Sequence, residues 1–239
     1  MNILITRQLD QSIKFSMMLK KANIKNFIFP AITIENLTPT KEDISNIEKS
    51  NFIIFTSQNS VLSLAKKYPI TNLSGKTIGA IGKSTEEFLN GMNMKVDIVP
   101  KEKFTSESLL DEIKNNKIDN KTVLIIKGEG GRDFLNKEFR KNNFVLKDCN
   151  IYKRCLPNNI KEIDNLKFKD VTHVCITSIE IFKNFLKIIK TIKFIINEDI
   201  TFVCGNERIG EEVSKIFKNN RILVSDDPSN DKMLKVIIS

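Results

Sequence analysis

The chain has 239 residues, a formal net charge of +9, 41% hydrophobic residues and 28% charged residues. This composition is typical of a soluble globular protein, and no apolar run approaches the roughly 18 residues of a membrane span. The amino terminus lacks the charged start and the longer apolar run of a signal peptide, so we expect a cytoplasmic protein with no membrane partner.

The positive charge suits an anionic partner, but it also follows from a general richness in Lys, Asn and Ile, and both explanations stay open. We expect no nucleic-acid partner, because the basic residues form no tract and the chain has no Trp and only two Tyr for base stacking. The four cysteines and the single histidine, His173, are scattered without a C-x-x-C motif. We therefore expect no metal site and reduced, buried thiols.

The first 50 residues predict a strand, a helix and a second strand. The helical spacing of Ile13 and Met17 predicts a helix over residues 11–22, with Asp10 as its cap and Asn23 at its end. Other segments complete this part: strands at 3–6 and 27–30, extended chain at 31–35, and one short helix within 36–50.

An apolar run that ends in two hydroxyl residues occurs twice. Thr56 and Ser57 end the first run, and Thr177 and Ser178 end the second, 121 residues later. Such a run is typical of a buried parallel strand, and a Ser directly after it can cap a helix. Each copy predicts a strand-to-helix junction at the carboxyl end of a sheet, where α/β folds bind ligands. A cap without any binding role is the alternative.

Further strands and helices follow each copy. Ser84 and Glu87 have the spacing of a capping box and predict a helix start. The segment Gly128-Glu129-Gly130-Gly131-Arg132 follows a strand and resembles an anion nest; it is no dinucleotide fingerprint, because Asp133 takes the place of the last glycine. The remaining predictions are strands at 76–81, 96–100, 122–127, 144–149, 172–177, 200–204 and 222–225, and helices that start near 104, 178 and 229 or end near 142 and 218.

The second half of the chain repeats the first. Leu4 aligns with Leu124 at an offset of 120, and Gly82 aligns with Gly205 at an offset of 123. A nearly constant offset predicts two copies of one parallel α/β unit, with a single wide sheet as the alternative. Two such lobes suggest a cleft lined by hydroxyls, glycines and backbone N–H groups, which suits carboxylates.

Seven short motifs occur in one order along the whole chain: Thr6-Arg7, Phe55 to Asn59, Ala80 to Gly82, Phe104 to Leu110, Lys127 to Arg132, Ile151 to Arg154, and Thr177-Ser178. Each motif is weak alone, but the ordered series resembles the uroporphyrinogen-III synthase family. The resemblance implies an α/β fold of two flavodoxin-like lobes joined by a two-stranded linker. Residues 1–33 plus 154–239 would form one lobe and residues 34–153 the other, with linking strands at 32–34 and 151–153.

The resemblance also implies an activity. The family cyclises hydroxymethylbilane, a linear tetrapyrrole with eight carboxylates, to uroporphyrinogen III, losing water and inverting the last ring without a cofactor. The protein must hold a flexible chain in one conformation, which is an effect of positioning. Tyr152 would be the proton donor for the leaving hydroxyl. The implied substrate-binding residues are Arg7, Thr56, Ser57, Ser84, Thr105, Ser106, Gly128, Thr177, Ser178 and Gly205.

Several alternatives stay open. Tyr152 can be a packing aromatic, and Arg7 can be a structural cation at a strand end. The segment Asn206-Glu207-Arg208 departs from the family's Pro-x-Thr and adds a negative charge, which puts substrate contact there in doubt. A non-catalytic two-lobed binding protein for a small polyanion is the rival function. With no long apolar surface stripe, we expect a monomer.

Overall fold

The chain divides into two compact α/β units with separate sheets. This computed structural model describes residues 1–101, 106–115, 122–130, 139, 141, 144–158, 160 and 170–239. The first unit holds Met1–Thr33 and Cys155–Ser239, and the second holds Ile34–Arg154. Two five-stranded sheets form, one for each unit, so the alternative of a single wide sheet is wrong.

The first unit is a doubly wound parallel sheet in the order β10-β9-β8-β1-β2, and every neighbouring pair is parallel. Counted along the chain within the unit, the strands follow the order 2-1-3-4-5 of flavodoxin-like folds, as predicted. Its elements are β1 (Asn2–Ile5), α1 (Leu9–Lys21), β2 (Lys25–Ile28), β8 (His173–Ile176), α7 (Ile179–Thr191), β9 (Thr201–Cys204), α8 (Glu207–Ile216), β10 (Ile222–Val224) and α9 (Asn230–Ile238).

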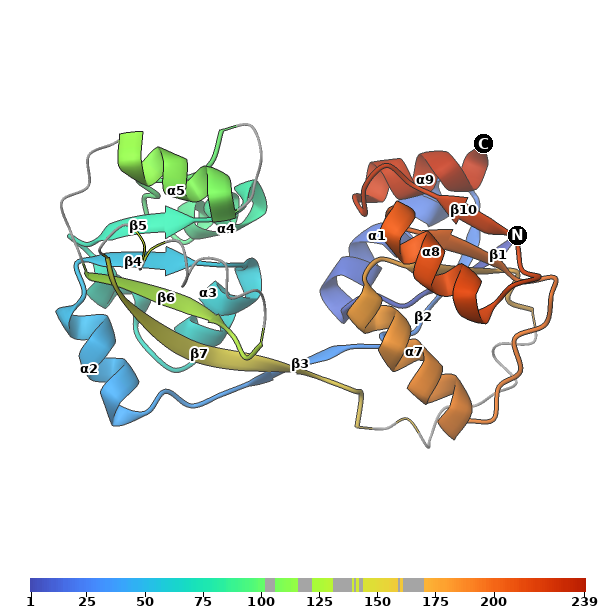
Figure 1. Cartoon of the computed structure of the whole chain (residues 1–239), viewed down its shortest axis with the longest axis horizontal. Coiled ribbons are helices and arrows are strands. Elements are labelled where there is room, and N and C mark those ends of the chain that lie inside the picture. Colours follow the sequence, from blue (N-terminus) through green and yellow to red (C-terminus); the bar gives the residue numbers. More distant parts are fainter. Residues whose placement is uncertain are drawn as a thin grey trace. The chain divides into compact units, whose positions relative to one another are not determined.

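Helices cover both faces of this sheet because its central strands are apolar on both sides (Figure 1). Ile3 and Ile5 of β1 pack with Phe15 of α1 and Met233 of α9 on one face. On the other face, the apolar sides of α7 and α8 pack against β8 and β9. Strands buried on two faces need near-continuous apolar runs, which is why the short runs were visible in the sequence.

The second unit has its own sheet in the order β3-β7-β6-β4-β5. Helices α2, α3 and α4 pack on one face, and α5 packs on the other. Its elements are β3 (Thr33–Asn36), α2 (Lys41–Lys49), β4 (Phe52–Phe55), α3 (Gln58–Ala65), a 3-10 turn (Ile70–Leu73), β5 (Thr77–Ala80), α4 (Lys83–Gly91), α5 (Ser106–Asn115), β6 (Thr122–Gly128) and β7 (Val145–Cys155).

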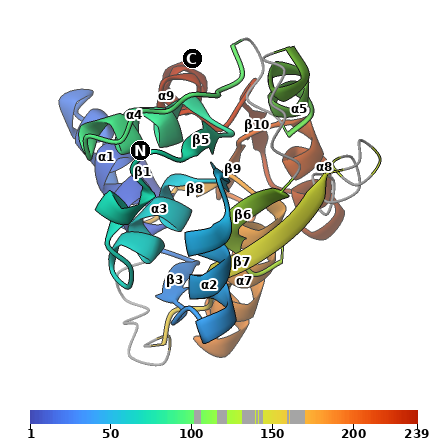
Figure 2. The same ribbon diagram turned by 90° about the vertical axis from the view of Figure 1, so that its left-hand side faces the viewer.

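The sheet orders confirm the internal duplication. Strands β5, β4, β6 and β7 follow one another as β9, β8, β1 and β2 do in the first unit. A single bridge between Gly79 and Ile98 takes the place of β10 beyond β5. Strand β3 is an addition that pairs with β7, where the Leu37 amide donates to the Ile151 carbonyl at 2.8 Å. Figure 2 shows the long strand β7 beside β6.

Three local predictions differ from the structure. Helix α1 begins at Leu9, so Asp10 lies in its first turn and does not cap it. Helix α4 begins at Lys83 after an extended Gly82, which places Ser84 inside the helix and excludes the predicted capping box. The strand expected at 96–100 is reduced to the bridge at Ile98, because the Asp97 side chain accepts the Ile78 amide at 2.9 Å and so replaces a backbone bond of the strand ladder.

Other local predictions are confirmed or lie outside the described residues. Asn23 has a positive φ of 57° directly after the last turn of α1, as expected for a residue that ends a helix. Ser229 precedes the first residue of α9. Arg132, and the helix expected to end near 142, fall largely on residues that are not described. In the described part of the chain, no helix is both long and apolar enough to cross a membrane.

Candidate active site

The carboxyl ends of β4 and β6 meet at one edge of the second sheet and hold several of the predicted site residues. Both the amide and the hydroxyl of Thr56 donate to the Ile126 carbonyl, at 3.2 and 3.3 Å. Ser57 caps α3, and its Oγ accepts the Ser60 amide at 3.2 Å. The two hydroxyl residues are half-buried and stand at the first turn of α3. Their strand-to-helix geometry is the one that the sequence predicts.

Tyr152 lies directly against this edge. Strand β7 pairs with β6 so that Tyr152 is opposite Gly128, after a bulge between Lys127 and Gly128. The Tyr152 side chain is 1% exposed, and its Oη lies 3.1 Å from the Ser57 Oγ. The Tyr152 carbonyl accepts the Glu129 amide at 2.7 Å. The phenol predicted as a proton donor is therefore buried beneath the hydroxyl that caps α3.

Gly128 provides the room for this ring. A Cβ atom at Gly128 would stand 2.5 Å from both Cε2 and Cζ of Tyr152, far inside van der Waals contact. The sequence indicated an anion nest at this glycine. Because the aromatic ring lies where a side chain would be, the close approach of Tyr152 is reason enough for a glycine here.

Arg154 is the residue of this site that sequence reasoning did not single out. Its Nη2 donates to the Tyr152 Oη at 3.3 Å, and its Cζ lies 5.5 Å from the centroid of the Tyr152 ring. Arg154 is itself exposed. The signal was present in the motif Ile151 to Arg154, because residues two apart on a strand share one face of the sheet.

The other predicted residues of the second unit lie on neighbouring elements. Ser84 is exposed in the first turn of α4, and its carbonyl accepts the Gln58 side-chain amide at 2.7 Å. This bond links the first turns of α3 and α4. Ser106 is the first residue of α5, and Thr105 lies outside the described residues.

The first unit has the corresponding edge at the ends of β8 and β9. Ser178 caps α7, and its Oγ accepts the Ile181 amide at 3.1 Å. Thr177 precedes it, and both residues are half-buried. At Gly205 a Cβ atom would stand 3.3 Å from the Thr177 Cα and 2.8 Å from the Pro228 Cβ. Gly205 thus lets the loop after β10 approach the Thr-Ser junction.

Arg7 follows β1 and is 7% exposed. Its Nη1 donates to the Asn230 side chain and its Nη2 to the Pro228 carbonyl. Its Cζ lies 5.8 Å from the Phe15 ring centroid. Burial lowers the pKa of the Arg7 guanidinium. These contacts fit a structural cation, and a direct ion pair with a ligand would require Arg7 to release the loop between β10 and α9.

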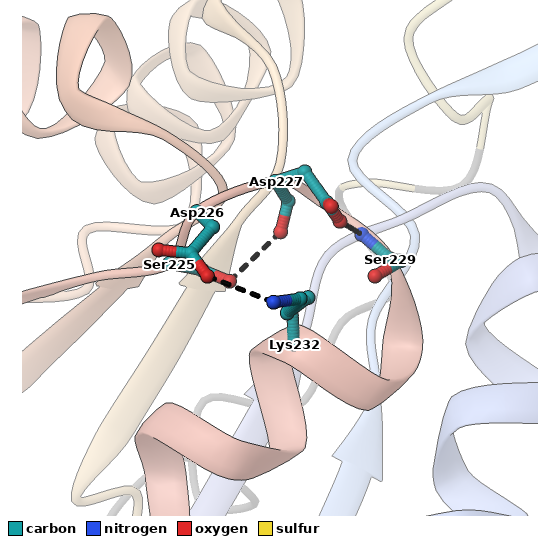
Figure 3. Close-up of polar contacts among 5 residues, drawn as sticks. All are labelled: Ser225, Asp226, Asp227, Ser229 and Lys232. Carbon is teal, nitrogen blue, oxygen red and sulfur yellow. Dashed lines mark hydrogen bonds and ion pairs between the residues drawn. The ribbon is translucent and has the colours of Figure 1, made fainter. Parts of the chain in front are cut away.

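That loop is further tied by its own polar side chains (Figure 3). The Ser225 hydroxyl donates to the Asp227 carbonyl at 2.8 Å, and an Asp227 carboxylate oxygen accepts the Ser229 amide at 2.7 Å. The Lys232 Nζ points from α9 to the Asp226 carboxylate at 2.9 Å. Hydrogen bonds from Ser229 hold the pKa of the Asp227 carboxyl below its usual value. The first turn of α9 therefore already faces two carboxylates, which would repel an anionic ligand.

We expect Arg7→Met to lower the free energy of unfolding by about 2 to 4 kcal/mol, because the Pro228 carbonyl and the Asn230 side chain both lose a charged donor. The measurement is urea unfolding of the full chain. Arg208→Met is the control, since Arg208 is exposed in α8 and its loss should change stability by less than about 0.5 kcal/mol. Equal stability of the two variants would contradict the structural role of Arg7.

Comparisons with known proteins decide the family. The family model described as uroporphyrinogen-III synthase HemD matches residues 14–235. The chain belongs to the uroporphyrinogen-III synthase family. This confirms the resemblance drawn from the seven ordered motifs. Uroporphyrinogen-III synthases are lyases, so the chain is an enzyme of tetrapyrrole biosynthesis. The alternative function, a non-catalytic binding protein, is not supported.

Individual relatives agree with the family model. A Methanocaldococcus jannaschii protein, provisionally named a uroporphyrinogen-III synthase, is 32% identical over 195 residues, or 78% of each chain. The Proteus mirabilis uroporphyrinogen-III synthase is 26% identical over 198 residues, which cover 78% of this chain and 98% of that protein. The crystal structure of Helicobacter pylori uroporphyrinogen-III synthetase aligns with a TM-score of 0.71 at 18% identity, over 99% of this chain and 98% of that one, which supports the fold.

In this member of the uroporphyrinogen-III synthase family, Asn206-Glu207-Arg208 replaces Pro-x-Thr. Local structure explains this replacement. Asn206 caps α8, and its Oδ1 accepts the Ile209 amide at 3.1 Å. Glu207 is exposed in the first turn of α8. The helix thus carries its own carboxylate near its positive end, which lowers the attraction of this end for a ligand carboxylate.

Three of the four cysteines are buried, as expected, whereas Cys155 at the end of β7 is half-buried. Burial raises the pKa of the Cys149, Cys175 and Cys204 thiols to about 12 each, so they stay protonated and are poor nucleophiles at neutral pH. His173 begins β8 and lies at the strand end opposite Thr177. Among the described residues, no group of three or more His, Cys, Asp or Glu side chains could hold a metal ion.

Proposed function

We propose that the chain converts hydroxymethylbilane to uroporphyrinogen III, with loss of water and inversion of the last ring. The buried phenol of Tyr152 at the edge of β4 and β6, 3.1 Å from the Ser57 hydroxyl, is the observation that carries this proposal. A phenol hydroxyl carries a hydrogen that it can donate to a leaving hydroxyl. Membership in the uroporphyrinogen-III synthase family supports the assignment.

The substrate carboxylates suit the capped helix starts of both units. In the proposal, Thr56, Ser57, Thr177 and Ser178 offer hydroxyls or backbone N–H groups at the starts of α3 and α7 to carboxylates, and the Thr56 hydroxyl exchanges its bond to the Ile126 carbonyl for one to the substrate. A charge-assisted hydrogen bond contributes about 1.5 to 3 kcal/mol net, so a few of them hold a polyanion without an Arg for each carboxylate. The other proposed contacts are Ser84, Thr105, Ser106, Gly128 and Gly205, with Arg7 as a contact only if it leaves the loop after β10.

Positioning is the main catalytic demand in this proposal. Unassisted ring closure gives the isomer without the inverted ring, so the protein must favour attack by the ring carbon that free substrate does not use. Holding both ends of the substrate in that geometry contributes more to the rate of this ring closure than the strength of the acid does. The helix starts at these edges are therefore assigned to the carboxylates of the substrate.

The test is the identity of the product. The full chain, incubated with freshly generated hydroxymethylbilane, should give the type III isomer by chromatography after oxidation to the porphyrin. A parallel incubation without protein supplies the type I reference. If the two incubations give the same isomer mixture, the enzymatic proposal fails for this chain. Binding of substrate without any change in isomer ratio would instead favour a polyanion-binding protein.

A further inference from the structure

The burial of Tyr152 raises the question of how its proton reaches a substrate. At 1% exposure, the Tyr152 side chain offers a ligand almost no accessible surface. Gly128 and the Ser57 hydroxyl cover it on the side of the sheet edge. Ser57 itself is half-buried and stands at the start of α3. A substrate bound at this edge therefore meets Ser57 before it meets Tyr152.

The hydrogen bonds around the phenol define which group donates. The Arg154 guanidinium can only donate, so its bond of 3.3 Å makes the Tyr152 oxygen an acceptor. The phenol hydrogen then needs an acceptor of its own, and among the described residues the Ser57 Oγ at 3.1 Å is the one within reach. If Ser57 donated to Tyr152 instead, the phenol hydrogen would be buried with no described acceptor, which is costly. The network therefore runs from Arg154 to Tyr152 to Ser57.

The Ser57 oxygen has a matching arrangement. It accepts the Ser60 amide at 3.2 Å as the cap of α3, and in this network it also accepts the Tyr152 hydrogen. Both of its acceptor sites are then used, and its own hydrogen is left for a third group. Because Ser57 is partly exposed at the sheet edge, this hydrogen faces solvent and is available to a ligand that binds there.

We infer that Ser57 is a catalytic residue that relays the proton of Tyr152 to the leaving hydroxyl of the substrate. This inference rests on the proposed function and assigns Ser57 a second role beside carboxylate binding. Tyr152 then acts through Ser57 and does not have to touch the substrate. Arg154, which donates to the same phenol oxygen, stabilises the charge that the relay leaves behind.

The carbon–oxygen bond of the hydroxymethyl group breaks with its electron pair on oxygen, and that oxygen takes the Ser57 hydrogen and leaves as water. Ser57 takes the Tyr152 hydrogen, and the negative charge rests on the phenol oxygen beside Arg154. The substrate keeps a cation conjugated with its pyrrole nitrogen. When ring closure releases a proton from a pyrrole carbon, that proton returns through Ser57 to Tyr152, so one water is lost overall.

The experiment is a double-mutant comparison on the full chain with hydroxymethylbilane, with the protein-free rate subtracted. Tyr152→Phe and Ser57→Ala should each lower kcat by about 100-fold, and the double variant should lower it no further, because the two groups act as one unit. Ser57→Thr, which keeps a hydroxyl and a cap, should restore kcat to within about threefold of the original protein.

Thr40→Ala is the matched control for the lost cap. Thr40 caps α2 in the same unit with the same reciprocal bonds, and it is exposed. Its loss should lower the thermal unfolding midpoint as much as Ser57→Ala does, with kcat unchanged. Ser57→Gly serves if Ser57→Ala folds poorly, because Gly is a better N-cap residue than Ala.

Two results would overturn the relay. One is a kcat for Ser57→Ala and Ser57→Gly close to that of the original protein, with only KM raised. The other is a double variant whose loss equals the product of the two single losses. Either result leaves the proposed function standing as long as the unsubstituted chain makes the type III isomer. Formation of the type I isomer alone by the unsubstituted chain would be the failure of the proposed function.

Discussion

Tyr152→Phe is expected to lower kcat about 100-fold, the lower end of what a general acid contributes, while KM changes by less than about threefold. The substitution removes one oxygen and keeps the ring that packs on Gly128. The lost hydroxyl acts only when the leaving group departs, so ground-state binding should be nearly unaffected. The measurement is steady-state formation of uroporphyrinogen III from fresh hydroxymethylbilane.

Tyr68→Phe is the control for this variant, since Tyr68 is the chain's other tyrosine and is buried in the same apolar cluster. It should keep the kcat of the original protein. Both variants should remain folded, because loss of one hydrogen-bonding hydroxyl costs about 1 kcal/mol. An unchanged kcat for Tyr152→Phe would return Tyr152 to the role of a packing aromatic.

Gly128→Ala is expected to have a larger combined effect, on stability and on turnover together. The new Cβ would stand 2.5 Å from two ring atoms of Tyr152, so the ring or strand β6 must move. Overpacking of this kind costs about 1 to 3 kcal/mol. The displaced phenol would lose its geometry with Ser57, and kcat should fall at least as far as in Tyr152→Phe. Urea unfolding and the same isomer assay measure the two effects.

Two companion variants separate these effects. At Gly91 an added Cβ meets nothing within 4 Å, so Gly91→Ala should leave both stability and kcat near those of the original protein. Tyr152→Leu combined with Gly128→Ala removes the clashing ring atoms and should recover much of the stability without recovering kcat. If Gly128→Ala alone is as stable and as active as the original protein, the close packing of Tyr152 on Gly128 contributes neither to stability nor to kcat.

The strand-to-helix junctions were accessible from the sequence because neighbouring residues determine them. The apolar runs before Thr56 and Thr177 are long enough to form strands buried on both faces. Ser57 and Ser178 each cap a helix whose first turn follows directly in the chain. A repeat of half the chain length then implies two equal sheets, which the strand orders confirm.

The first residue of a helix was harder to predict from the sequence where a glycine and a polar residue can both take the cap position. Ser84 and Glu87 have the capping-box spacing, but Gly82 adopts an extended backbone and begins α4 earlier. The capping-box spacing does not exclude an earlier start, and the structure uses that earlier start without a side-chain cap.

The sequence alone therefore determines that this chain folds into two parallel α/β units with paired hydroxyls at their strand ends, since local periodicity and capping carry that information. Tertiary structure alone decides that Tyr152 is buried on Gly128 with its hydroxyl against Ser57, 95 residues away. It also decides that Arg7 binds the loop before α9, more than 220 residues away. Such contacts depend on strand register and strand order, and no pattern among neighbouring residues encodes either of them.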